Sequence, residues 1–326
     1  MGIHSFSKTF TGREIKFRNL KHLTVVVDAS VIAYQSALGI KNINTLTDGD
    51  GNPTIHINVV IAKCLNFKKH KADQLWVFDF HEKGYINPSK IFETDRRKKI
   101  KDESKAKLEK LKETKNDLFS SDDEDDIDSK IQTQERVGFS MSDTIINDIK
   151  YILNCFEIPW CESPRGYEAE SICALLTQDG KDGDLVWTTD TDAIIYGATQ
   201  MVRELKVKQK KVLMLYDLNS ILDDNDITMG DLRKIAVILG CDHCPKTPRV
   251  GPKTVLKKFK NIELTDPQKT AITVFGKTYD VSKLNWNNKN CDPFKTTDKM
   301  DMLLNWVESK NFNRGRIRKQ IDNALN

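Results

Sequence analysis

The chain has 326 residues, of which 39% are hydrophobic and 30% are charged, so it can bury a core and is not disordered throughout. Its 51 Lys and Arg nearly balance 47 Asp and Glu, and the net charge of +4 predicts no class of partner. No run reaches the roughly 18 consecutive apolar residues of a membrane span, so we expect a soluble intracellular protein with no membrane contact. The length suggests two domains, or one domain with a substantial extension.

Three short apolar runs each end in an aspartate or lead directly into one: residues 23–28, 75–79 and 184–189. Strands of this kind, separated by helix-length segments, predict a mostly parallel central sheet flanked by helices on both faces. The fold class is therefore α/β. The apolar residues of three segments are spaced as in a helix, which predicts helices at 55–70, 141–156 and 168–177. A pair of strands is expected at 199–206 and 211–217.

The segment from 94 to 140 interrupts this pattern. Residues 94–116 hold ten Lys or Arg and five Asp or Glu, and 121–128 add six acids in eight positions. Such blocks are usually solvated or disordered, but the first part is also rich in helix formers. A mobile basic helix that folds over a polyanion is the alternative, and the segment is an insertion in either case.

After residue 217 the pattern becomes helical. Residues 228–239 form an amphipathic helix that ends at Gly240, and a second helix starts near Pro252, a residue suited to the first helical position. The turn-rich segment between them completes a helix–two-turn–helix unit. Its lysines would suit a phosphate backbone, which contacts protein mainly through charge.

Seven carboxylates stand out by their placement at or after a predicted strand, at a helix start, or, for Asp242, after a helix: Asp28, Asp79, Glu168, Glu170, Asp190, Asp192 and Asp242. If they converge, each pair at about 4 Å repels by roughly 4 kcal/mol at an effective dielectric of about 20, so protons or cations must neutralise them. Oxygen ligands without histidine select hard ions such as Mg²⁺ or Mn²⁺, and two such ions are the usual apparatus of phosphodiester hydrolysis. For any single acid, a helix cap or a solvated charge is the alternative.

The seven cysteines are scattered, and reduced, mostly buried thiols are expected. Cys241 and Cys244 have the spacing of half a zinc knuckle, but no second Cys or His pair follows at a suitable distance, which disfavours zinc.

Several blocks together resemble the flap endonuclease/XPG family of structure-specific 5′ nucleases. They are MGI at the start, VVVDAS, LWVFD, GYEAES, TTDTDAIIYG and GCDHC…VGPKT, in family order up to about residue 260. The resemblance implies a Mg²⁺-dependent endo/exonuclease that cuts DNA flaps or junctions, with Mn²⁺ as a substitute. It assigns Asp28, Asp79 and Glu168 to a first ion, and it assigns the other four acids to a second.

The resemblance also implies roles for other side chains. Tyr34 would stack on the nucleotide at the cleavage site, and Lys90 and Arg97 would grip the scissile phosphate. Lys41 and Lys63 stand where the family uses arginines against the DNA backbone. Lysine keeps the positive charge, but it lacks the guanidinium group with which arginine binds a phosphate through two hydrogen bonds.

In the helix–two-turn–helix, Gly251 and Lys253 would anchor duplex DNA. Arg249 replaces a glycine of the family's hairpin, which argues against the K⁺ that the family binds there and suggests a direct phosphate contact instead. No aromatic-pair sliding-clamp motif is found near the C-terminus. We expect a compact, monomeric member, viral or cellular, located in the nucleus (the host nucleus if viral) or alternatively in the cytoplasm.

The expected organisation has five parts. Residues 1–93 and 141–225 build the nuclease domain, and 94–140 form a charged arch. A helix–two-turn–helix region at 226–265 and a helical extension at 266–326 follow.

Three other functions are the alternatives to this nuclease activity. A PIN-like ribonuclease shares the sheet and several acids, and a non-catalytic junction-binding protein would need no complete acid set. A phosphatase with an aspartyl nucleophile requires a second aspartate at the position that Ser30 occupies here.

Overall fold

The structure is a computed structural model that describes residues 2–38, 47–49, 54–82, 84–116, 121–138, 141–178, 182–207 and 210–325. Within these ranges, no helix combines the length and the apolar character needed to cross a bilayer.

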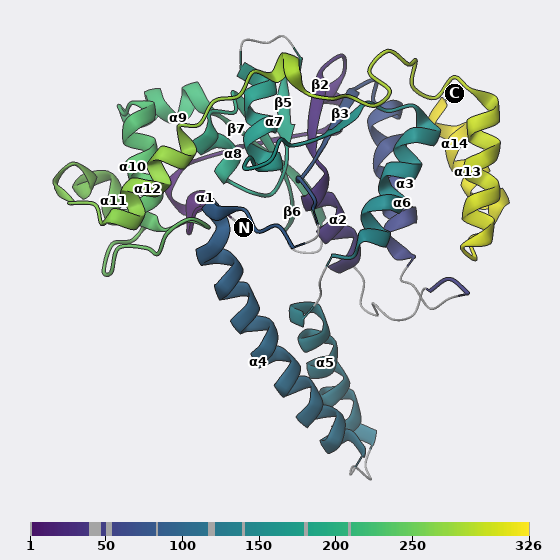
Figure 1. The fold of residues 1–326 in the computed structure, drawn as a ribbon, viewed down its shortest axis with the longest axis horizontal. Coiled ribbons are helices and arrows are strands. Elements are labelled where there is room, and N and C mark those ends of the chain that lie inside the picture. The colour runs from purple at the N-terminus through teal and green to yellow at the C-terminus, as the bar shows by residue number, and fades with distance from the viewer. Residues whose placement is uncertain are drawn as a thin grey trace.

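A seven-stranded mixed sheet lies at the centre of the molecule, in the order β1-β7-β6-β5-β2-β3-β4 (Figure 1). Neighbouring strands from β6 to β4 pair in parallel, whereas β6 with β7 and β7 with β1 pair antiparallel. This architecture confirms the predicted α/β class. The strands are β1 (Arg13–Ile15), β2 (Thr24–Asp28), β3 (Asp73–Phe78), β4 (Trp160–Glu162), β5 (Leu185–Trp187), β6 (Gln200–Val207) and β7 (Lys210–Asp217).

Both faces of the sheet are buried, which explains why its central strands are continuously apolar. Successive side chains of a strand point to opposite faces. In β2, Val25 and Val27 therefore join one core, and Val26 joins a second core on the other side. Trp76, Phe67 and Trp187 fill much of the first core with large buried rings.

Helices cover each face. The first core is completed by α2 (Ala29–Leu38), α3 (Ile55–Lys69), α6 (Asp143–Phe156), α13 (Thr297–Ser309) and α14 (Arg314–Leu325). The second core is completed by α1 (Phe6–Thr9), α7 (Ala169–Thr177), α8 (Asp192–Tyr196), α9 (Leu218–Asn225), α10 (Met229–Leu239), α11 (Pro252–Lys258) and α12 (Asp266–Phe275). Short 3₁₀ turns lie at Phe17–Leu20, Pro88–Lys90, Phe259–Asn261 and Val281–Lys283.

The charged insertion forms two long helices that project from the body as a hairpin (Figure 1). They are α4 (Ile91–Asn116) and α5 (Ser121–Gly138). The Ser104 hydroxyl donates to the Gln134 carbonyl at 2.8 Å, and Lys115 pairs with Asp128 at 2.6 Å. Of the two alternatives for this segment, the structure therefore adopts the helical one, and α4 already starts at Ile91, three residues before the expected boundary.

Candidate metal centre

The predicted acids gather at the carboxyl end of the parallel strands. Asp28 is the last residue of β2, Asp79 directly follows β3, and Asp190 lies three residues beyond β5. Because β2 pairs in parallel with both β3 and β5, these three ends meet at one edge. The chain order reverses its direction across the sheet between β2 and β5, and such a switch point is where open α/β sheets bind ligands.

Hydrogen bonds hold the first two carboxylates in place. Asp28 accepts from the Thr188 hydroxyl at 2.9 Å and from the Val31 amide at 3.2 Å. Asp79 accepts from the Ser30 hydroxyl at 2.5 Å and from the Ala169 amide at 2.9 Å. Each carboxylate therefore ties its own strand to a neighbouring segment.

Helix α7 brings two glutamates to the same edge. Glu168 is the N-cap residue in an extended conformation, and Glu170 lies in the first turn. This change of backbone conformation lets both side chains reach one cation, although residues i and i+2 of a regular helix do not face each other. The Lys90 ammonium lies 3.3 Å from Glu168 and 3.2 Å from Glu170.

The turn after β5 supplies two further aspartates. The Asp192 amide donates to Asp190 Oδ1 at 3.0 Å. One oxygen of Asp192, Oδ1, is buried without a hydrogen-bond partner. Burying an unpaired carboxylate oxygen is costly, so this atom is suited to a ligand.

Gly2 packs directly against this turn. The Ile3 amide donates to the Thr191 hydroxyl at 2.8 Å. A Cβ on Gly2 would lie 2.3 Å from Asp190 Oδ1, and Gly2 has a φ of +80°. The N-terminal segment therefore forms one wall beside the acids.

Burial and mutual repulsion perturb the pKa values of the acids. Burial is the largest cause for Asp28, Asp190 and Asp192, followed by neighbouring carboxylates, and it raises the pKa of Asp190 to about 7. Burial also raises the pKa of Glu168. For Glu170, burial is outweighed by the Lys90 ammonium and by hydrogen bonds, which hold its pKa at about 2.

The donor set fits a divalent cation. It consists of carboxylate oxygens, the preferred ligands of Mg²⁺ and Mn²⁺, and it contains the unpartnered Asp192 oxygen. Among the described residues, no three His, Cys, Asp or Glu side chains already form a ligand set around one point. In this structure the Lys90 ammonium supplies part of the compensating charge.

A second positively charged side chain, Arg97, reaches the acids from helix α4. Arg97 Nη2 lies 3.3 Å from Asp242 Oδ2, and Arg97 Nε lies 2.5 Å from Glu93. Burial opposes the charged form of Arg97, but Glu93, Asp242 and the nearby Tyr34 outweigh it and raise its pKa. The structure therefore places Lys90 and Arg97 against acids of the cluster and half-buried Tyr34 near Arg97, and the roles assigned to these three side chains stay predictions.

Three residues at the site escaped the sequence analysis. Glu93 is 2% exposed and binds both Arg96 and Arg97. The Tyr196 hydroxyl contacts Glu168 at 3.2 Å and His243 Nε2 at 3.1 Å. The only sequence signal for His243 is that it adjoins Asp242, and neither Glu93 nor Tyr196 gives a signal beyond its helical position.

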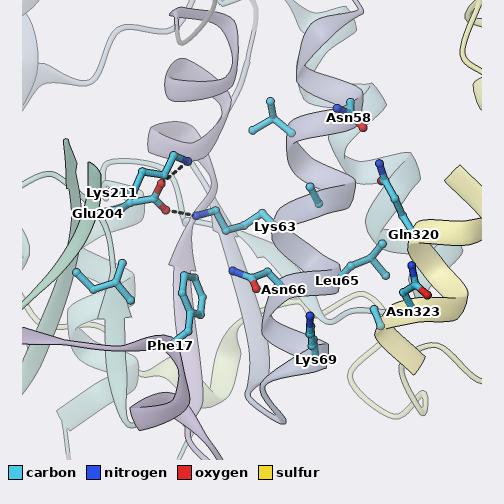
Figure 2. Close-up of a pocket in the computed structure, with 14 residues that line it drawn as sticks. Phe17, Asn58, Lys63, Leu65, Asn66, Lys69, Glu204, Lys211, Gln320 and Asn323 are labelled. Carbon is cyan, nitrogen blue, oxygen red and sulfur yellow. Dashed lines mark hydrogen bonds and ion pairs between the residues drawn. The ribbon is translucent and has the colours of Figure 1, made fainter. Parts of the chain in front are cut away.

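Lys63 lies elsewhere, in a cavity of about 620 Å³ between α3, α14 and the β6–β7 strand pair (Figure 2). It pairs with Glu204, which Lys211 contacts from another side at 2.6 Å. Its ammonium also lies 4.5 Å from the centre of the Trp187 ring. The charge of Lys63 is therefore already partnered within the fold. Lys41, the companion prediction, lies outside the described residues.

The predicted duplex anchor forms an exposed surface before and at the start of α11. Arg249 is exposed and has a φ of 62°, the left-handed region that favours glycine. Gly251 is the N-cap of α11 in an extended conformation, and Lys253 is exposed. That Arg249, Gly251 and Lys253 bind DNA stays a prediction.

The fold combines a mostly parallel α/β sheet, acids at its switch point and a projecting helical hairpin, and comparisons with known proteins find the same combination of sequence and fold. The XPG I-region matches residues 157–242, which include five of the seven acids. Flap endonuclease 1 of Methanocaldococcus jannaschii is 27% identical over 323 residues, which cover 96% of this chain and 91% of that protein.

Solved structures show the same fold. The flap endonuclease-1 structure from Methanococcus jannaschii superposes with a TM-score of 0.70 at 23% identity, covering 98% of this chain and 97% of that chain. Human GEN1 in complex with Holliday junction DNA gives a TM-score of 0.62 at 16% identity, covering 99% and 77% of the two chains. The chain is therefore similar to flap endonuclease 1 along nearly its whole length, and it contains a match to the XPG I-region.

Proposed function

We propose that this protein is a Mg²⁺-dependent, structure-specific 5′ endo/exonuclease that hydrolyses phosphodiester bonds of DNA at flaps or junctions, in replication, repair or recombination. One observation carries the proposal: buried carboxylates from distant segments meet at the sheet switch point, with an Asp192 oxygen left without a partner. Full-length similarity to a flap endonuclease supports the substrate class.

The seven acids would hold two divalent cations. Asp28, Asp79 and Glu168 form the group of the first ion, and the others form the group of the second: Glu170, Asp190, Asp192 and Asp242. When bound, the ions supply Lewis-acid stabilisation of the charge that develops on the attacking and leaving oxygens.

The cationic side chains act on the phosphate. Lys90 and Arg97 now rest on acids of the site. Divalent ions would take over the neutralisation of Glu168, Glu170 and Asp242, and both side chains would then be available to bind the scissile phosphate. Donors placed where negative charge develops stabilise a transition state more than a ground state. Tyr34, beside Arg97, would stack on the terminal nucleotide.

The rest of the molecule would bind DNA without reading its sequence. The hairpin of α4 and α5 would contact the single-stranded 5′ end, and Arg249, Gly251 and Lys253 would anchor the duplex. Such contacts are electrostatic and weaken with salt. The division into a nuclease domain (1–93 and 141–225), an arch (94–140), an anchor (226–265) and an extension (266–326) follows from these roles.

Cleavage by an Asp192→Asn variant tests the proposal. Loss of one carboxylate from the metal site should lower single-turnover cleavage of a 5′-flap DNA in Mg²⁺ by at least ~10³-fold, since metal-assisted stabilisation supplies several kcal/mol. DNA binding should be largely kept. Asp224→Asn, at an exposed position on α9, serves as the control.

The same assay separates the alternatives. Flap, gapped, bubble and four-way-junction DNAs, each with Mg²⁺ or EDTA, define the preferred structure, and matched RNA flaps test for a ribonuclease. Unchanged turnover in Asp192→Asn, or cleavage that persists in EDTA, would contradict the proposed function.

A further inference from the structure

We propose that Cys241 and Cys244 are an oxidation site, at which a small hydroperoxide closes a reversible disulfide that inactivates the metal centre. The site itself stands on geometry alone. Its effect on catalysis rests on the proposed function, because Asp242 lies between the two cysteines.

The two thiols are already in contact. Their sulfurs lie 3.6 Å apart. The Cys241 amide donates to the Cys244 carbonyl at 3.1 Å, and the Cys244 amide donates to the Cys241 carbonyl at 3.4 Å. These reciprocal bonds make the cysteines the base of a two-residue loop. A disulfide has an S–S distance of about 2.05 Å, so closing the bond requires the sulfurs to approach by about 1.5 Å.

A cavity gives a small oxidant access to this pair. Both cysteines are buried, but they line a cavity of about 420 Å³ together with His4, Arg96 and Pro245. A small hydroperoxide fits such a volume. The exposed Cys291 needs no such cavity for access.

The loop between the cysteines carries two residues that are tied to the metal centre. Asp242 contacts Arg97 at 3.3 Å. His243 binds the Ser89 carbonyl at 3.0 Å through Nδ1 and the Tyr196 hydroxyl at 3.1 Å through Nε2. Functional side chains must be held within about 0.5 Å of their working position. Whatever part of the roughly 1.5 Å closure the loop backbone takes up beyond this tolerance would displace Asp242 from its place among the acids.

The reaction balances with one molecule of hydroperoxide. The thiolate of one cysteine attacks the peroxide oxygen, the O–O bond breaks, and a sulfenic acid and water (or an alcohol) result after proton transfer. The second thiolate then attacks the sulfenic sulfur, the S–O bond breaks, and a second water leaves as the S–S bond forms. The two sulfurs lose two electrons and the peroxide gains them. A dithiol reductant reverses the change by thiol–disulfide exchange.

The experiment uses the full chain carrying Cys291→Ser, which removes the exposed thiol. After hydrogen peroxide treatment, intact mass and alkylation mapping should show the loss of two hydrogens and a Cys241–Cys244 link. Flap cleavage and the Mg²⁺-induced rise in melting temperature should both fall, cleavage by at least tenfold, and both should recover with dithiothreitol. Cys291→Ser combined with Cys244→Ser should keep both responses after peroxide.

Two results would overturn the inference: no Cys241–Cys244 link in the treated protein, or a link that leaves cleavage and the Mg²⁺ response unchanged. The mapping does not depend on activity or on the Cys244 variant folding well. If the reduced protein itself cut no DNA, the proposed function would fail, while the mapping and the Mg²⁺ response would still test the switch.

Discussion

At the scale of single residues, the site depends on carboxylates that are costly to bury. Asp190 and Asp192 are 5% and 1% exposed, and burial together with neighbouring acids raises the pKa of each. Without cations, protons or the Lys90 ammonium must compensate this charge. The same residues that make the site unfavourable without a compensating charge would therefore give it the proposed affinity for Mg²⁺.

Gly2 provides a test of this wall of the site. We expect Gly2→Ala to lower flap cleavage at least tenfold, because its Cβ would collide with Asp190 Oδ1 and Thr191 and because a φ of +80° strains alanine. The measurement is single-turnover cleavage at several Mg²⁺ concentrations.

Gly315→Ala on α14 is the matched control, since its Cβ would meet nothing closer than 3.4 Å. Equal cleavage by Gly2→Ala and Gly315→Ala would show that the packing of Gly2 against Asp190 is unimportant.

Lys90 should have opposite effects on metal binding and on cleavage. In the DNA-free protein its ammonium occupies the space between Glu168 and Glu170, so Lys90→Met should tighten Mg²⁺ binding severalfold. Cleavage should nevertheless fall by about 10²-fold, since the phosphate loses a charged donor. Calorimetric titration with Mg²⁺ and single-turnover kinetics measure the two effects.

The charge-removal control is Lys319→Met at an exposed position on α14, for which both quantities should stay at the wild-type value. Weaker Mg²⁺ binding in Lys90→Met would contradict the competition between Lys90 and the metal.

The sequence pointed to the acids because six of them stand at or just past strand ends or at a helix start, and Asp242 follows a helix, so a short-range pattern is visible. It could not identify Tyr196 or His243, because their partners are distant in sequence and are defined only by packing. Glu93 pairs with Arg96 and Arg97 within one helical turn, a spacing common on any charged helix, and only packing reveals that it is buried. For Lys63, the sequence predicted a role but could not show its partners within the fold. Its charge suggested a DNA contact, but the fold places it against Glu204 and the Trp187 ring.

At the scale of elements, the most predictable parts were those with strong internal patterns. The apolar runs became β2, β3 and β5, and the amphipathic segments became α3, α6 and α10. Strands β1 and β4 have three residues each, as β5 does, but unlike β5 they contain charged residues and form no continuous apolar run in the sequence. The charge pattern of 94–140 allowed both disorder and helix, and pairing of α4 with α5 is a tertiary contact that no local pattern reports.

The packing of α3 against the β6–β7 strand pair gives a prediction about Lys63. Lys63→Ala should lower the free energy of unfolding by about 1–3 kcal/mol, because Glu204 loses a buried partner and Trp187 loses a packed side chain. Chemical denaturation measures this change.

Lys211→Ala removes the other partner of Glu204, but Lys211 has a side chain 77% exposed, so its cost should stay below about 1 kcal/mol. If Lys63→Ala left stability unchanged and weakened flap binding tenfold, Lys63 would contact DNA, as the sequence predicts, rather than stabilise the fold.

At the scale of the whole molecule, a net charge of +4 conceals a separation of charge. Acids collect at the switch point of the sheet, basic side chains of α4 reach them from the base of the projecting hairpin, and lysines lie exposed around α11. DNA bound across these regions would meet positive charge along α4 and around α11, and its phosphate would meet the acids at the switch point. Bound divalent cations would have to offset the negative charge of these acids there.

Cation binding by the acid cluster is tested most directly by anomalous diffraction from crystals soaked in Mn²⁺. We expect the Lys90 ammonium to move off the two glutamates and anomalous peaks to appear among the seven acids: Asp28, Asp79, Glu168, Glu170, Asp190, Asp192 and Asp242. Crystals of Asp192→Asn should lose at least one peak. Carboxylates that stay apart in the wild-type crystals, with no anomalous density between them, would contradict the account.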